Sequence, residues 1–156
     1  MGYTTEFRGK FTVDREVDDE TFKLLRGLAE TRRMRRGGLD AQYGLDGEFY
    51  IDPQGDFGQS DKPLEGTIVD SNKPPRSQPS LWCQWTIEED RKTICWDGGE
   101  KFYYYVEWIK YLINSILAPK DYKVNGSVQW RGEEFGDDGI IVVVDNKVTI
   151  NRGELI

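Results

Sequence analysis

The sequence predicts an α+β domain in which an antiparallel or mixed sheet carries two helices packed on one of its faces. Several segments alternate apolar and polar residues with the two-residue period of strands, and two others repeat apolar residues every three to four positions, as helices do. Most connections between the strands are short turns, which favour antiparallel pairing over Rossmann-type winding. A chain of 156 residues is expected to fold as one domain, 1–156, around one core.

The first strand is expected over residues 3–14, because its residues alternate between two faces. One face carries Tyr3, Thr5, Phe7, Phe11 and Val13, and the other carries Thr4, Glu6, Arg8, Lys10 and Thr12.

The first helix is expected to begin after a cap at Asp18 or Asp19 and to end at Gly37-Gly38. Its apolar face comprises Phe22, Leu25, Leu28 and Ala29. Four arginines are then predicted in its last turn, where positive charge complements the helix dipole: Arg32, Arg33, Arg35 and Arg36.

Residues 39–79 are rich in Gly, Pro, Asp, Ser and Asn, so we expect a long ordered loop with one or two short strands, at 49–51 and 67–69. Residues 81–86 and 93–96 are then predicted to form a hairpin. Burial favours the register that places Trp85 opposite Trp96 and Ile87 opposite Ile94. In this register Cys83 and Cys95 lie on opposite faces, so no disulfide is expected.

A second helix is expected from Glu100 to Ala118 or earlier, because Pro119 cannot continue it and Asp97 can cap it. Its apolar face comprises Phe102, Val106, Ile109, Ile113 and Ile116, widened by Tyr105, Trp108 and Leu112. The closing strands are predicted at 124–131, 140–144 and 148–151.

Composition limits the chemistry that the chain can perform. It contains no histidine, which removes the usual base for a Ser or Cys nucleophile and the commonest nitrogen ligand of zinc. Two cysteines cannot complete a zinc site, and no cofactor is expected. A net charge of −7 disfavours nucleic acid as a partner. No apolar run is long enough for a membrane span, and the N-terminal MGYTTEFRGK lacks the basic-then-apolar layout of a signal peptide, so a cytoplasmic location is expected.

Five segments distributed along nearly the whole chain resemble a family of small bacterial and phage proteins for which no activity is established. These segments are MGYTTEF, ETRRM at 30–34, LWCQW at 81–85, WDGGEKFYYYVEWIKYLI at 96–113 and NGSVQWRGEE at 125–134. The resemblance implies a shared fold and a phage or prophage origin. Small phage proteins often block a host factor, so a phage-encoded inhibitor or accessory protein is one expectation.

A surplus of aromatic residues gives the leading functional hypothesis, a non-enzymatic binding protein that engages a protein partner or a small ligand. Trp82, Tyr103, Tyr104 and Tyr111 fall outside the best-buried faces, so they are candidates for an exposed groove beside the long loop. The alternative is that these rings only thicken the core.

Two further hypotheses remain open. Gly98 and Gly99 before a helix, with Glu100 and Lys101, suit a sequestering pocket for a nucleotide-like anion over which Arg32 or Arg33 closes. The competing interpretation is a strand-to-helix turn capped by Asp97. A carboxylate-dependent hydrolase would instead use acidic side chains from 46–61, from Asp97 with Glu100 or from 133–138, although solvated turns explain the last cluster well.

Overall fold

The structure is a computed structural model that describes residues 3–51 and 65–152. It confirms the α+β class, with six strands in one antiparallel sheet, two strands in a small second sheet and two α-helices. In chain order the elements are β1 (Glu6–Val13), α1 (Asp19–Glu30), β2 (Arg35–Arg36), β3 (Ile68–Asp70), β4 (Trp85–Ile87), β5 (Thr93–Trp96), α2 (Tyr105–Leu112), β6 (Val124–Arg131), β7 (Asp138–Val144) and β8 (Lys147–Arg152).

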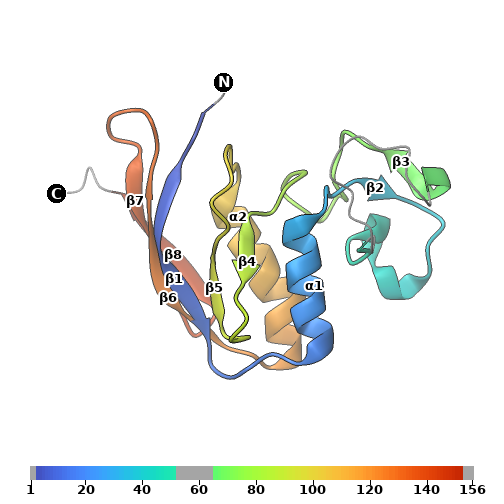
Figure 1. The fold of residues 1–156 in the computed structure, drawn as a ribbon, viewed down its shortest axis with the longest axis horizontal. Helices are drawn as coiled ribbons and strands as arrows, with labels where there is room; N and C mark the ends of the chain where they lie inside the picture. The colour runs from blue at the N-terminus through green and yellow to red at the C-terminus, as the bar shows by residue number, and fades with distance from the viewer. Residues whose placement is uncertain (1–2, 52–64, 153–156) are drawn as a thin grey trace.

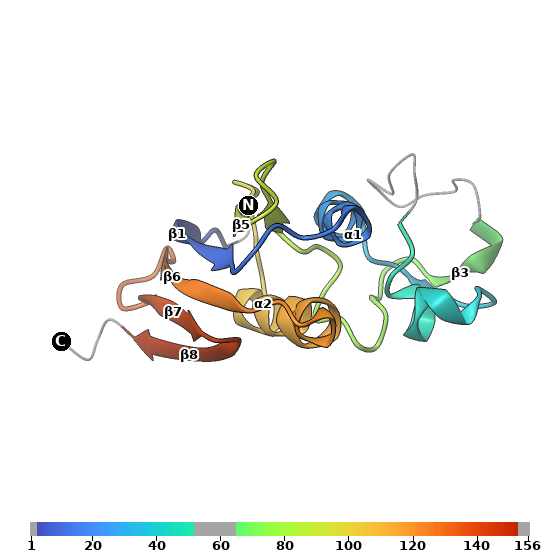
Figure 2. The same ribbon diagram turned by 90° about the horizontal axis from the view of Figure 1, so that it is seen from below.

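The large sheet has the strand order β4-β5-β1-β6-β7-β8 and curves around α2, while α1 packs beside β4 (Figures 1 and 2). We call the face that the helices cover the inner face and the opposite one the outer face. Alternation on β1 follows the prediction, since Phe7, Phe11 and Val13 are buried while Glu6 and Arg8 are exposed. The hydrophobic core therefore lies between the inner face and the helices.

Two glycines on neighbouring strands allow the sheet to coil. Gly9 of β1 has φ 114° and Gly126 of β6 has φ 140°, values that side-chain-bearing residues rarely adopt. A Cβ at Gly9 would lie 2.4 Å from the Ser127 carbonyl oxygen, and one at Gly126 would lie 2.5 Å from that of Lys10. Glycine at these positions lets the two backbones cross closely enough for the sheet to wrap α2.

The predicted hairpin is confirmed in its register, with Trp85 paired to Trp96 and Ile87 to Ile94. Its first strand is shorter than predicted, because residues 81–84 lie outside β4. Both cysteines are free. The closing strands β6, β7 and β8 lie where the sequence predicted them, to within two residues.

The first helix ends earlier than predicted. Asp18 caps it as expected, accepting the Thr21 N–H at 2.7 Å, but Thr31 is already extended. The Thr31 hydroxyl donates to the Gly27 carbonyl at 2.7 Å, and the chain then leaves the helix toward β2. The four arginines consequently follow the helix rather than occupy its last turn, so the prediction of a dipole-matched helix end is wrong.

Residues 32–51 and 65–80 form a part of the molecule that we call the lobe. It contains the small β2–β3 sheet and lies beyond α1, away from the large sheet (Figure 1). The predicted strand at 67–69 is present as β3, whereas residues 49–51 form no strand. Residues 52–64 of the predicted long loop lie outside the described residues.

Candidate functional site

The segment 97–104 connects β5 to α2 and carries most of the side chains that the sequence predicted for a binding site. It is not helical, so the prediction of a helix start near Glu100 is wrong, and α2 begins at Tyr105. The physical reason is Phe102, which is 1% exposed and packs with its ring centroid 5.2 Å from that of Trp85. The core gains more from burying this ring than a further helical turn would provide.

Two residues within this segment, on either side of Phe102, have a left-handed backbone, with φ 60° at Lys101 and 61° at Tyr104. Such a conformation costs a residue with a side chain about 1–2 kcal/mol, and it is concentrated at functional sites. With this backbone, the Tyr103 and Tyr104 rings point outward, and they are 45% and 58% exposed.

The glycine turn differs from the predicted one. The Asp97 carboxylate accepts the Gly99 N–H at 2.8 Å and so closes a tight turn, rather than capping a helix. The Gly99 carbonyl accepts the Trp96 indole N–H at 3.2 Å. Gly98 and Gly99 thus precede an irregular segment, and their N–H groups do not form a helix N-terminus.

The opposite wall comes from the end of the lobe. The indole N–H of Trp108, in α2, donates to the Ser80 hydroxyl at 2.8 Å. That hydroxyl in turn donates to the Trp82 carbonyl at 3.3 Å. A buried side chain of the helix therefore fixes the backbone that carries the half-buried Trp82 ring.

Between the two walls lies a groove of about 640 Å³, which we call the aromatic groove. It unites four of the predicted site residues, Trp82, Glu100, Lys101 and Tyr104. Asp97, Gly98 and Gly99 adjoin it without lining it. Its lining consists of Pro74, Pro79, Ser80, Leu81, Trp82, Gln84, Glu100, Lys101, Tyr103 and Tyr104.

Arg32 and Arg33 are not part of this groove. Arg33 is 2% exposed, and its guanidinium donates to Thr31 Oγ1 and to the Tyr50 carbonyl at 2.7 and 2.9 Å. Arg32 donates through Nε to the Ser71 carbonyl at 3.0 Å. Both guanidinium groups hold the lobe together, so closing over an anion would require breaking these bonds.

Tyr111, which the sequence placed among the exposed rings, is buried at 7% exposure. Its hydroxyl donates to Glu48 Oε1 at 2.7 Å and accepts from Gln78 Nε2 at 3.1 Å. The prediction failed because the lobe, far away in sequence, covers this face of α2.

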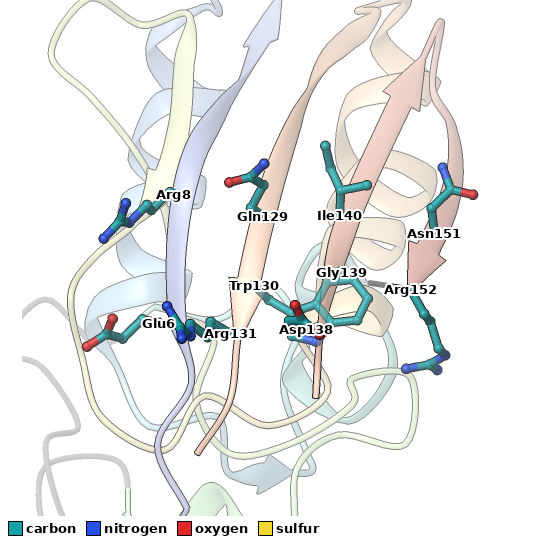
Figure 3. A pocket seen from close by; sticks show the side chains of 10 residues that line it. All are labelled: Glu6, Arg8, Gln129, Trp130, Arg131, Asp138, Gly139, Ile140, Asn151 and Arg152. Carbon is teal, nitrogen blue, oxygen red and sulfur yellow. The ribbon is translucent and has the colours of Figure 1, made fainter. Parts of the chain in front are cut away.

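A second hollow, of about 430 Å³, lies on the outer face of the large sheet and was not predicted. Its central row is Arg8, Gln129, Ile140 and Asn151, which pair in this order across β1, β6, β7 and β8 (Figure 3). The alternation along each strand predicts that these residues are exposed. Which of them lie side by side depends on the strand order, which the sequence did not predict. Trp130 borders the hollow and is 3% exposed, so the hollow offers polar side chains rather than an open ring.

Neither cysteine is suited to act as a nucleophile. Burial raises the pKa of the Cys83 thiol to about 12 and that of Cys95 to about 11, so both are protonated at neutral pH.

The acidic clusters are used structurally. Asp137 accepts the Tyr3 hydroxyl at 2.5 Å and the Trp130 indole N–H at 3.1 Å, and Glu133 accepts the Thr4 N–H at 2.6 Å. Asp46 pairs with Arg76, while residues 52–61 of that cluster lie outside the described residues. Within residues 3–51 and 65–152, no three Asp, Glu, Cys or His side chains converge as a metal site would require.

Comparison with protein-family models, with curated proteins and with solved structures finds no match for this chain. Across the described ranges, no helix combines the length and apolarity that a bilayer crossing requires.

Proposed function

We propose that the protein is a non-enzymatic binding protein that engages a partner protein by holding an extended segment of that partner in the aromatic groove. The observation that carries this proposal is the exposure of Tyr103 and Tyr104 by a strained backbone opposite a half-buried Trp82. Exposed rings on a rigid scaffold supply contact area with little loss of side-chain entropy on binding.

The composition of the groove favours an extended, proline-containing segment. Grooves lined by Trp and Tyr bind polyproline II peptides, whose conformation is preformed and so costs little entropy to fix. Pro74 and Pro79 add rigid apolar surface to one wall, while Glu100 and Lys101 line the other. Because the chain carries a net charge of −7, segments with positive residues will also associate faster. A phage-encoded inhibitor of a host factor would be one use of such a groove.

The test is selection from a library of displayed random peptides with three forms of the protein. We expect the wild type to enrich one family of sequences that contains proline and Lys or Arg. Tyr103→Ala combined with Tyr104→Ala should weaken binding of these peptides more than about tenfold, the order of one lost aromatic anchor. Phe135→Ala is the matched control, because Phe135 is a fully exposed ring outside the groove.

Failure to enrich any family, or peptides that bind the double variant as tightly as the wild type, would refute the proposal. Thermal-shift measurements with mononucleotides and cyclic dinucleotides test the alternative function, a pocket for a nucleotide-like anion. Stabilisation by these compounds that is lost in Lys101→Ala would favour that alternative.

A further inference from the structure

The two edges of the large sheet are treated differently by the rest of the molecule. At one edge β4 has three residues, α1 packs beside it, and the Arg26 guanidinium donates to the Ile87 carbonyl. At the other edge β8 has six residues, all paired to β7 without interruption. Figure 2 shows β8 at the free end of the curved sheet. No described element covers it.

Most of the devices that protect an exposed edge are missing from the middle of β8. Proteins shield such edges with proline, with a bulge, with charged side chains or with a covering segment, because unpaired N–H and C=O groups recruit another strand. β8 includes no proline, its register to β7 has no bulge, and its two charged residues, Lys147 and Arg152, stand at its ends. A regular edge whose middle residues are uncharged and unshielded is a site for pairing with a further strand.

The inner side of this edge offers apolar surface to such a strand. Val148 and Ile150 share the inner face, because their partners on β7 are the buried Val143 and Ile141. Ile150 is 38% exposed and borders a hollow of about 360 Å³ between β8 and the first turn of α2. A strand added to β8 would place its inward side chains at this hollow.

We infer that the strand that pairs with β8 is the β8 of a second copy, arranged antiparallel about a two-fold axis at Thr149. In that register Val148 lies opposite the partner's Ile150, so like faces meet. Lys147 lies opposite the partner's Asn151, and no two cations face each other. Glu107 and Lys110 on the same rim supply both signs of charge. The edge is thus complementary to itself, and pairing joins two sheets into one continuous sheet.

The experiment measures the dimer dissociation constant of the full chain by sedimentation equilibrium, for the wild type and for two opposite substitutions at Asn151. Asn151 is exposed on the outer face, so either change is tolerated by the fold. Asn151→Glu creates two Lys147–Glu pairs across the axis and should tighten the dimer about fivefold. Asn151→Lys creates two Lys–Lys pairs and should weaken it about fivefold.

Net charge alone predicts the reverse order. The chain already carries −7, so an added negative charge increases repulsion between copies and an added positive charge reduces it. Gln129→Glu and Gln129→Lys are the matched controls, because Gln129 lies in the same cross-strand row, two strands away from the edge. These controls should show only the net-charge effect.

Three results would overturn the inference. The first is a wild type that stays monomeric up to millimolar concentration. The second is a pair of Asn151 variants whose dimer affinities follow the order of the Gln129 controls. The third is a dimer whose affinity neither Asn151 substitution changes. The order expected from the register, with Glu tighter than Lys at 151 alone, supports it.

Discussion

The body of the molecule, formed by the large sheet with its helices, and the lobe are held together by different forces. In the body, Trp85, Phe11 and Trp108 are fully buried among other apolar side chains. In the lobe, the central buried group is the Arg33 guanidinium, which donates to Gln78 Oε1 and to the Glu48 and Tyr50 carbonyls. Apolar packing is non-directional, whereas a buried cation is stable only with its full set of acceptors.

This difference matters for function because the aromatic groove lies where the two regions meet. Tyr103 and Tyr104 belong to the body, and Pro74, Pro79 and Leu81 belong to or adjoin the end of the lobe. The backbone N–H of Arg33 donates to the Leu81 carbonyl at 2.7 Å. This bond links the polar network around the Arg33 guanidinium to the groove wall. One wall of the groove is therefore anchored to the core through Phe102, and the other is anchored both to the core through Trp108 and to the polar network of the lobe.

The largest expected effect is in the body. Phe11 is 0% exposed at the centre of the sheet, with its ring centroid 5.3 Å from that of Trp85. Phe11→Ala should lower the free energy of unfolding by about 3–5 kcal/mol, because it removes buried area and leaves a cavity. Urea denaturation measures this loss. Tyr43→Ala, which removes a half-buried ring from the lobe, should cost less, and an equal cost would remove the distinction between the regions.

The next effect should be confined to the lobe. Arg33→Met keeps the side-chain volume but leaves the buried acceptors without their donor, at a cost of about 3 kcal/mol. Hydrogen exchange should show loss of protection at Gly37, whose N–H bonds to Thr67, with protection of the sheet retained.

Arg32→Met is the control for this change, because Arg32 is only half-buried. It should have a smaller effect on the same amides. Equal loss of protection in the sheet and the lobe after Arg33→Met would show that the two regions unfold as one unit. If the groove binds peptide as proposed, Arg33→Met should also weaken that binding while Tyr103 and Tyr104 stay in place.

The contrast also explains which parts of the structure the sequence predicted. Strand alternation and the facing of Trp85 with Trp96 follow from where apolar side chains must go, and both are confirmed. The arginine run at 32–36 resembled a solvated helix end, because charged residues are usually exposed. Nothing local in the sequence indicates that acceptors from Glu48, Tyr50 and Gln78 surround Arg33, since they come from distant positions.

The sequence anticipated some of the residues that line the groove, but not the backbone that carries them. Trp82, Lys101 and Tyr104 do line one groove. Local rules, in which Asp97 and two glycines begin a helix, favoured a capped strand-to-helix turn there and left an anion site as an alternative. Phe102 is instead buried in the core, and its burial prevents a helix from starting at Glu100. A local sequence pattern cannot show whether helix capping or burial against distant residues will prevail.

A smaller effect concerns the link between α2 and the lobe. Tyr111→Phe removes the hydroxyl that donates to Glu48 Oε1 and keeps the ring, whose centroid lies 5.6 Å from that of Trp108. The expected cost is about 1–2 kcal/mol, from one hydrogen bond to a charged acceptor. A double-mutant cycle with Glu48→Gln should give non-additive costs. Strict additivity would mean that the hydroxyl and the carboxylate are not coupled.

The smallest effect is a dependence on acid, and it occurs in both regions for different reasons. In the lobe, hydrogen bonds from the Arg76 side chain lower the pKa of Asp46 to about 2. In the body, the Thr93 hydroxyl, with the N–H groups of Lys92 and Thr93, lowers the pKa of Asp90 to about 2. The pKa of an Asp side chain in the unfolded chain is about 3.9. Each carboxylate thus contributes stability above that value, which is lost as the pH falls from about 4 through about 2.

Hydrogen exchange, with pH 4.5 to pH 2 as the conditions of the test, should therefore show both regions opening as the pH falls. The Gly37 N–H reports on the lobe, and the Glu88 N–H, which donates to the Thr93 carbonyl at 2.8 Å, reports on the hairpin. Asp46→Asn should flatten the response of Gly37 alone, and Asp90→Asn that of Glu88 alone. High salt distinguishes the two causes. It screens the Asp46–Arg76 pair, in which the Arg76 side chain is 65% exposed, but not hydrogen bonds from the neutral donors around Asp90. A response of Glu88 that salt abolishes would show that charge pairing, rather than neutral hydrogen bonding, stabilises the hairpin.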